Sequence, residues 1–145
     1  FLGLTINRDE VRTPMQWDET RNAGFSPAQN TWLPVHENYR NVNVKKENAE
    51  DDSLLNAIRA LNKIRANEKP LREGSLELLD DLPVGVLGYA RKFENEKVLV
   101  LLNFDGQNKE FEIEPAKCIF SLSGKEEIKD KTIRLNGFGG VIVKY

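Results

Sequence analysis

The strongest periodic pattern in the chain lies between residues 51 and 68. Apolar side chains recur there at the three- and four-residue spacing of one helix face, and polar side chains fill the opposite face. The apolar positions are Leu54, Leu55, Ile58, Leu61 and Ile64. Residues 51–53 are Asp-Asp-Ser, which can accept hydrogen bonds from the first backbone amides of a helix. The pattern predicts an amphipathic helix over 51–68 that ends before Pro70 and packs its apolar face on another surface.

A different pattern fills residues 71–145. Short apolar or alternating stretches are separated by turn residues such as Glu94-Asn95-Glu96 and Asp105-Gly106. The expected strands are 75–79, 84–93, 97–104, 110–114, 116–122, 131–135 and 140–145. Short strands at this spacing, with no helical pattern between them, predict an antiparallel β-sandwich.

Residues 7–50 show neither a helical nor a strand period. They are rich in Asn, Asp, Pro, Gly and Thr, and they also carry Trp17, Phe25, Trp32 and Tyr39. Disordered segments are depleted in aromatic residues, and long ordered loops are usually functional. We therefore expect an ordered, irregular loop that packs on a scaffold.

Charge and composition narrow the classes of partner. The chain has 145 residues, with 21 Lys and Arg against 23 Asp and Glu, so its net charge is −2. This balance argues against nucleic acid and an anionic membrane surface as partners, since both need a clustered basic excess. The longest apolar run, 98–102, is far too short to span a membrane.

The chain offers few candidates for a metal or a cofactor. His36 and Cys118 are the single histidine and the single cysteine, too few for a structural zinc site. The acidic run over 47–52 lacks the alternating ligands and the glycine of a calcium loop. We expect no metal and no cofactor. One cysteine cannot form an internal disulfide and suits a reducing compartment, so we expect a cytoplasmic location.

Several short motifs characterise the loop over residues 7–50. They are RDEVRTPMQWD (8–18), NAGF (22–25), WLPV (32–35), NY (38–39) and NV (43–44). This set resembles the α-glucosidase and oligo-1,6-glucosidase family, within the α-amylase clan of retaining glycoside hydrolases. In that family the motifs follow the eighth strand of a (β/α)8 barrel, the next helix is the last of the barrel, and an antiparallel sandwich comes after it.

The resemblance implies a fold class that is mostly β. An antiparallel C-terminal β-sandwich over 71–145 would follow the last loop and helix of a truncated (β/α)8 barrel over 1–70. Because the only methionine is Met15, we expect a piece of a longer protein. In the family the three acidic groups that act on the sugar lie on earlier strands of the barrel. We therefore expect no catalytic residue here and no activity of this chain alone, whereas the parent protein would be a glycoside hydrolase.

One residue of the loop is expected to touch substrate. In the family, the arginine of RTPMQW reaches the innermost sugar and pairs with an upstream acidic residue, which places Arg12 in the substrate-binding site. A guanidinium fork can hold a carboxylate and sugar hydroxyls together. Arg8 and Asp9 are expected to fix the loop, and Met15, Gln16 and Trp17 to pack beneath it. Trp32 remains open between packing and the edge of a cleft.

Several alternatives remain at this stage. The parent would bind an oligosaccharide and hydrolyse its terminal α-glucosidic bond, but trehalose synthases and other clan members that rearrange glucosides share the loop. A non-catalytic transporter-associated scaffold and a carbohydrate-binding module over 71–145 are the other readings. The module is disfavoured because its aromatic residues occupy positions typical of a core. Self-association through exposed barrel-facing surface is also expected. His36 has no partner spaced for catalysis, and Cys118 is expected to be buried.

Overall fold

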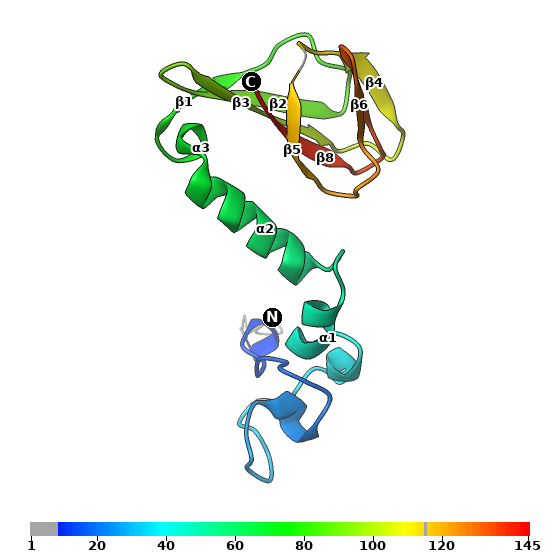
Figure 1. Ribbon diagram of the computed structural model, residues 1–145. Coiled ribbons are helices and arrows are strands. Elements are labelled where there is room, and N and C mark those ends of the chain that lie inside the picture. The colour runs from blue at the N-terminus through cyan, green and yellow to red at the C-terminus, as the bar shows by residue number, and fades with distance from the viewer. Residues whose placement is uncertain (1–8, 115) are drawn as a thin grey trace, which may run out of the picture. The chain divides into compact units, whose positions relative to one another are not determined.

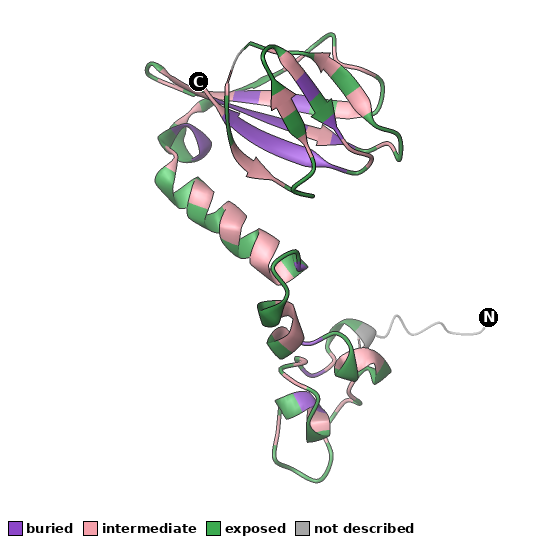
Figure 2. Ribbon diagram, turned by 45° about the vertical axis from the view of Figure 1, so that its right-hand side comes forward, coloured by how far each residue is buried: buried purple, intermediate pink, exposed green. Residues whose placement is uncertain are grey.

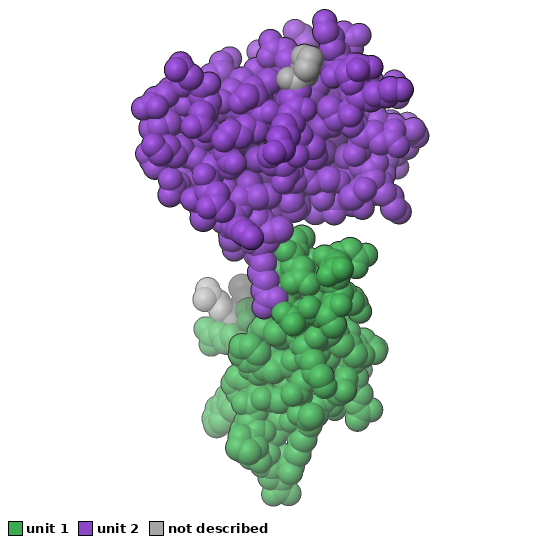
Figure 3. All heavy atoms as spheres, in the orientation of Figure 1, with its two compact units in different colours: residues 1–57 green, residues 58–145 purple. Residues whose placement is uncertain are grey.

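The chain divides into two compact units. The computed structural model describes residues 9–114 and 116–145. Residues 1–57 form one unit, called here the loop unit, and residues 58–145 form the other, called the sheet unit (Figure 3). The predicted domain boundary between residues 70 and 71 stays a prediction.

The loop unit is irregular, as its sequence predicts. Its described residues hold three short 3-10 helices, Asp9–Val11, Arg21–Gly24 and Glu37–Arg40, and the short helix α1, Val44–Ala49. The helix α1 is not predicted by the sequence pattern, because six residues are too few to show a period. It begins where the Asn43 side chain accepts a hydrogen bond from the Lys46 amide at 3.0 Å.

The predicted amphipathic helix is confirmed as α2, Leu54–Asn67. Ser53 caps its start, with Oγ accepting a hydrogen bond from the Asn56 amide at 3.2 Å. Pro70 does more than end a helix. It lies in the first turn of a further short helix, α3, Lys69–Glu73, where a missing backbone N–H breaks no helical bond. The sequence analysis did not predict α3.

The sheet unit contains two antiparallel sheets, in agreement with the predicted sandwich. The strands are β1 Ser75–Leu78, β2 Val86–Phe93, β3 Glu96–Asn103, β4 Lys109–Glu112, β5 Lys117–Ser121, β6 Glu127–Lys129, β7 Thr132–Leu135 and β8 Gly140–Lys144. The larger sheet has the order β1-β2-β3-β8-β5 and the smaller one β4-β7-β6 (Figure 1). Strand β6 is the one that the sequence pattern did not predict.

The main core fills the space between the two sheets. Alternate residues of β2, β3 and β8 point inward from the larger sheet and pack against residues of β7 from the smaller one. Figure 2 colours the buried residues of the sheets purple. The buried members are Ala90, Leu99, Leu101, Ile133, Leu135, Val141 and Val143. Within these strands the opposite alternation therefore faces away from the smaller sheet.

A second cluster lies on that opposite, outer face of the larger sheet. Val98, Val100 and Ile142 pack there with Leu71 of α3, and Leu61 and Ile64 of α2 contact the same cluster. The prediction for the apolar face of α2 is thus half confirmed. Leu61 and Ile64 are partly buried, but Leu54 and Ile58 remain 71% and 47% exposed within the described residues.

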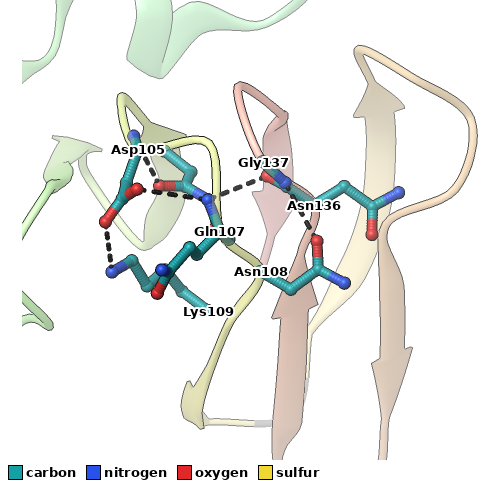
Figure 4. Close-up of polar contacts among 7 residues, drawn as sticks. Asp105, Gln107, Asn108, Lys109, Asn136 and Gly137 are labelled. Atoms are coloured by element: carbon teal, nitrogen blue, oxygen red, sulfur yellow. Dashed lines mark hydrogen bonds and ion pairs between the residues drawn. The ribbon is translucent and has the colours of Figure 1, made fainter.

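Figure 4 shows polar contacts of Asp105, Gln107, Asn136 and their neighbours at one end of the sandwich, where two loops are joined through the Asn103 side chain. This side chain is 3% exposed. Its Nδ2 donates hydrogen bonds to the carbonyl oxygens of Gln107 and Asn136, each at 2.8 Å, and its Oδ1 accepts one from the Asp105 amide at 3.0 Å. Lys109 Nζ contacts the Asp105 carboxylate at 2.7 Å, and that hydrogen bond lowers the pKa of Asp105. One buried amide therefore connects the β3–β4 and β7–β8 loops.

Candidate substrate-binding loop

The NAGF motif builds a tight turn. Asn22, Ala23 and Gly24 all have positive φ, at 55°, 55° and 68°. Asparagine and glycine are the residues that tolerate this conformation best. The turn closes back on Trp17, whose amide donates to the Ala23 carbonyl at 2.8 Å. A Cβ on Gly24 would lie 2.8 Å from the Asp18 carboxyl carbon, so the position also requires the smallest residue.

Side chains of the same turn hold the next segment of the loop. Asn22 Nδ2 donates to the carbonyl oxygens of Ser26 at 3.1 Å and Ala28 at 2.8 Å, and Arg21 donates to that of Gln29 at 2.6 Å. Hydrogen bonds from the side chain and the backbone of Thr20 lower the pKa of Asp18. The polar groups of residues 18–22 are thus largely used to shape the loop.

The MQW and NV motifs fit together. The amides of Val44 and Lys45, at the start of α1, donate to the carbonyl oxygens of Gln16 and Trp17, each at 2.9 Å. Asn43 is buried, and its Nδ2 donates to the Tyr39 carbonyl at 2.8 Å. These bonds satisfy amides that a helix leaves open at its N-terminus. The segment 15–17 and the start of α1 are therefore one structural piece.

The described residues of this loop form two neighbouring hollows on its surface. The larger, of about 540 Å³, is lined by Arg21, Asn22, Asn30, Thr31, Trp32, Pro34, Val35 and Tyr39. The smaller, of about 320 Å³, is lined by Arg12, Thr13, Pro14, Met15, Phe25, Ser26, Asn30, Thr31, Trp32 and Leu33. Trp32 contributes to both and is 99% exposed. An aromatic face beside arginine and amide groups can stack on a sugar ring and donate hydrogen bonds to its hydroxyls.

Arg12 lines the smaller hollow with an exposed side chain. Its backbone amide donates to the Asp9 carbonyl at 3.0 Å, which fixes the backbone at the start of the motif. Within the described part of the chain, the Arg12 guanidinium has no hydrogen-bond or ion-pair partner. Its five donors thus remain available to a group outside this chain.

Other residues named in the sequence analysis contribute to the structure of the loop. Met15 and Trp17 are about half exposed, so within this chain they pack only in part. His36 caps the 3-10 helix that starts at Glu37, with Nδ1 accepting from the Asn38 amide at 3.2 Å. Arg8 lies outside the described residues.

The prediction that Cys118 is buried is wrong. Its thiol is exposed and lies 3.3 Å from the Phe120 carbonyl oxygen, because β5 is an edge strand of the larger sheet. Partial burial nevertheless raises the pKa of the thiol above its ordinary value. The thiol is therefore a poor nucleophile at neutral pH.

Sequence reasoning also missed contributors to the larger hollow. Arg21 was not singled out, and Tyr39 was noted only as an aromatic residue of the loop. No spacing rule marks them, because the two residues are far apart in the sequence and line one hollow only after the loop has folded. Among the described residues, no cluster of His, Cys, Asp and Glu could hold a metal ion. None of the helices in the described part is long and apolar enough to cross a membrane.

Two protein-family models match the chain. The model of the α-amylase catalytic domain matches residues 3–74, and the model of the C-terminal domain of the α-amylase SusG matches residues 86–142. The first match covers the whole candidate loop, α2 and α3. The second covers most of the two sheets.

Curated relatives carry glucosidase names. Glucan 1,6-alpha-glucosidase of Streptococcus pneumoniae is 39% identical over 109 residues, which is 75% of this chain and 20% of the relative. Oligo-1,6-glucosidase of Halalkalibacterium halodurans is 35% identical over 114 residues, 79% of this chain and 20% of the relative. The chain thus spans about a fifth of the length of these relatives.

Solved structures of sugar-converting enzymes share the fold. A trehalulose synthase, MutB, superposes with a TM-score of 0.85 at 29% identity, covering 96% of this chain and 26% of that one. The isomaltulose synthase PalI of Klebsiella sp. superposes with a TM-score of 0.82 at 27% identity, covering 95% and 26%.

Proposed function

The chain belongs to the α-amylase family, and from this membership we propose that it forms the last substrate-facing loop and the C-terminal domain of an α-glucosidase. The enzyme would hydrolyse terminal α-glucosidic bonds of oligosaccharides. The observation that carries this proposal is the exposed pair of side chains, Arg12 and Trp32, on a hollow within the segment that matches the catalytic domain.

Arg12 is proposed as the substrate-binding residue of this chain. Its guanidinium, which has no partner among the described residues, would hold hydroxyls of the terminal sugar and an acidic residue supplied by the rest of the catalytic domain. The side chain of Trp32 would present its flat face to the sugar at the same rim. Retaining glycosidases need two carboxyl groups about 5–5.5 Å apart, one as nucleophile and one as acid and base. We propose that these come from elsewhere in the enzyme, so that this chain alone is inactive.

The test uses a chimera in which this chain replaces the segment of the Streptococcus pneumoniae enzyme to which it aligns. The chimera is expected to release glucose from isomaltose or maltose, and the 145-residue chain alone is not. Arg12→Ala in the chimera should lower kcat/KM by at least about a hundredfold, which corresponds to about 2.7 kcal/mol. Arg12→Lys should restore little, because an ammonium group lacks the planar fork.

A thermal melting curve distinguishes a role of Arg12 in substrate binding from a role in folding. The Arg12→Ala chimera should melt within a few degrees of the parent chimera. If activity falls only in proportion to lost folded protein, Arg12 has a structural role and the proposed binding role is wrong.

A second candidate function is rearrangement of a glucoside. It is favoured by the similarity to the trehalulose and isomaltulose synthase structures over nearly the whole chain. The products that the chimera forms from sucrose distinguish the two functions. Free glucose and fructose indicate hydrolysis, and an isomeric disaccharide indicates rearrangement.

Two further properties are proposed on more general grounds. A cytoplasmic location is supported by the single cysteine, which forms no internal disulfide. Self-association of the isolated chain is supported by the exposed side chains of Trp17 and Trp32 in the loop unit. Light scattering of the purified chain over a range of concentrations tests the second property.

A further inference from the structure

The chain contains one Asn-Gly pair, Asn136-Gly137, which lies in the turn between β7 and β8. An asparagine followed by glycine is prone to deamidation, because glycine has no Cβ to keep its backbone nitrogen away from the preceding side chain. Within the turn, the Gly139 amide donates to the Asn136 carbonyl at 2.9 Å. The Phe138 amide donates to the Asp105 carbonyl, also at 2.9 Å, so the turn is bound to the β3–β4 loop.

The two members of the pair differ in how strongly the fold requires them. A Cβ at Gly137 would lie 2.1 Å from the Gly106 carbonyl oxygen, so this close approach of two loops requires glycine. The side-chain amide of Asn136 has no hydrogen-bond partner among the described residues, and the residue is only partly buried. Figure 4 shows this amide pointing away from Asp105 and Gln107. It can therefore rotate toward the Gly137 nitrogen without breaking a contact.

The turn also contains a strained backbone position. Phe138 has a φ of 56°, a conformation that is costly for a residue with a bulky side chain. Its side chain is 70% exposed, and that of Phe104 in the adjoining loop is 65% exposed. The expectation that the aromatic residues of 71–145 fill the core is therefore wrong for this pair. A strained turn with an exposed side chain opens at a lower cost than the strands beside it.

The neighbouring loop contains a second pair that can form the same kind of cyclic imide, Asp105-Gly106. An ionised carboxylate is a poor electrophile, so this pair reacts only when the carboxyl group is protonated. Lys109 Nζ contacts the Asp105 carboxylate at 2.7 Å, and the Gln107 amide donates to it at 3.1 Å. These hydrogen bonds lower the pKa of Asp105 and hold its side chain in place. The Asp105 pair is thus protected, whereas Asn136 has neither the charge nor the contacts.

We propose that Asn136 is a site of spontaneous deamidation in the folded chain and that Asn108 slows the reaction. The Gly137 backbone nitrogen loses its proton and attacks the carbonyl carbon of the Asn136 side chain. A C–N bond forms, ammonia leaves, and a cyclic imide results. Water then opens the ring at either carbonyl, which gives aspartate or isoaspartate. Asn108 Oδ1 accepts a hydrogen bond from the Gly137 amide at 3.1 Å, and this bond must break before the nitrogen can attack.

The isoaspartate product changes a hydrogen-bond acceptor that joins two loops. The Asn136 carbonyl oxygen accepts from Asn103 Nδ2 at 2.8 Å and from the Gly139 amide at 2.9 Å. In isoaspartate the main chain runs through the former side chain, and the original carbonyl group becomes a free carboxylate. The turn is then one carbon longer and its acceptor no longer lies on the main chain. Deamidation therefore weakens the connection between the β3–β4 and β7–β8 loops.

The test incubates the folded 145-residue chain in mildly alkaline buffer and follows its tryptic peptides by mass spectrometry. Peptide 135–144 contains Asn136 as its one asparagine. It should gain the mass of one deamidation, and part of the product should be methylated by protein isoaspartyl methyltransferase. Fragment spectra of peptide 98–109 should show no isoaspartate at Asp105 over the same period. Asn136→Ser removes the site and should abolish the signal in peptide 135–144.

Two variants of the neighbouring loop test the role of Asn108. Asn108→Ala frees the Gly137 amide and should speed the reaction by at least about twofold, the factor that one exposed hydrogen bond contributes. The matched control is Gln107→Ala, which also truncates an exposed side chain of this loop but leaves the Gly137 amide bound. Its rate should equal that of the parent chain. Equal rates for Asn108→Ala and the parent would overturn the role of Asn108.

The chain unfolded in urea provides the rate without the fold. If Asn136 reacts in urea but not in the folded chain, the fold protects the pair and the proposal is wrong. The deamidated form carries one additional negative charge, so ion exchange separates it from the parent. The isoaspartate fraction should unfold at a lower urea concentration than the parent, and an equal midpoint would contradict the proposed effect on the two loops.

Discussion

Removal of one buried amide should uncouple two loops of the sheet unit. Asn103→Ala deletes three hydrogen bonds at once, two to backbone carbonyls and one from a backbone amide. Each such bond contributes about 1 kcal/mol net, and a buried group left unpaired costs about 1–3 kcal/mol. Gln107 is exposed, so water can reach its carbonyl and limit the loss there. We expect the free energy of unfolding to fall by about 3 kcal/mol.

The assay is urea denaturation of the 145-residue chain, followed by far-UV circular dichroism. Both tryptophans lie in the loop unit, so their fluorescence does not report on the sheets. Hydrogen exchange of the β3 and β8 amides is therefore used to show that the loss of stability lies in the sheet unit. Asn108→Ala is the control. This exposed side chain accepts one hydrogen bond, from the Gly137 amide at 3.1 Å, and its loss should cost no more than about 0.5 kcal/mol.

A second variant separates the donors from the acceptor. Asn103→Asp keeps an oxygen for the Asp105 amide but faces the two carbonyls with a group that cannot donate when ionised. It should be at least as unstable as Asn103→Ala at neutral pH. If Asn103→Ala costs less than about 1 kcal/mol, or no more than Asn108→Ala, the idea that Asn103 joins the two loops is wrong.

Three further predictions concern stability, each measured by urea denaturation. Leu61→Ala leaves a gap at a partly buried contact and should lower the free energy of unfolding by about 1–2 kcal/mol. Leu54→Ala, on the exposed end of the same helix, should lower it by less than about 0.5 kcal/mol. Equal effects of the two variants would show that α2 does not dock on the sheet. Lys144 binds the Glu68 carboxylate at 2.6 Å, so Lys144→Met should cost about 1 kcal/mol, and an unchanged midpoint would refute a role for the pair. Burial of the Glu126 carboxyl raises its pKa, but hydrogen bonds from two serines outweigh this effect and leave the pKa below the usual 4.5. The contribution of Glu126 to the free energy of unfolding is therefore present above pH 4.5 and is lost as the pH falls through the lowered pKa. Glu126→Gln should flatten this decline of stability with falling pH, and an equally steep decline in the variant would contradict the assignment.

The sequence predicted elements that carry a sustained pattern. The helix α2 and seven of the eight strands in the described residues were expected close to their observed bounds, because most of them lie in a periodic or continuous apolar stretch. Strand β6 has three residues with one apolar side chain, Ile128, so no period can be recognised there. The helices α1 and α3 are short, and they depend on the Asn43 cap and on Pro70 in the first turn.

The sequence could not distinguish the two faces of the larger sheet. Strand β3 is apolar at every position from Val98 to Leu102, because one of its faces packs against the smaller sheet and the other is partly covered by α2 and α3. Phe104 continues this run and therefore resembles a core residue. Its exposure follows from the register and from which partner is present, and neither can be read from alternation alone.

In the loop, some residues of the motifs stabilise the backbone and others line the hollow. Asn22 and Gly24 stabilise the turn, through a hydrogen bond and through the positive φ that glycine tolerates. Asn43 stabilises the start of α1 through its hydrogen bonds. Arg12 and Trp32 contribute to neither and instead line the hollow with exposed side chains. A loop that fixes its backbone with one set of residues holds the other set in place before any ligand arrives, which lowers the entropy lost on binding. This division explains how a segment without helix or strand periodicity can be ordered and still present the exposed side chains of the proposed binding surface.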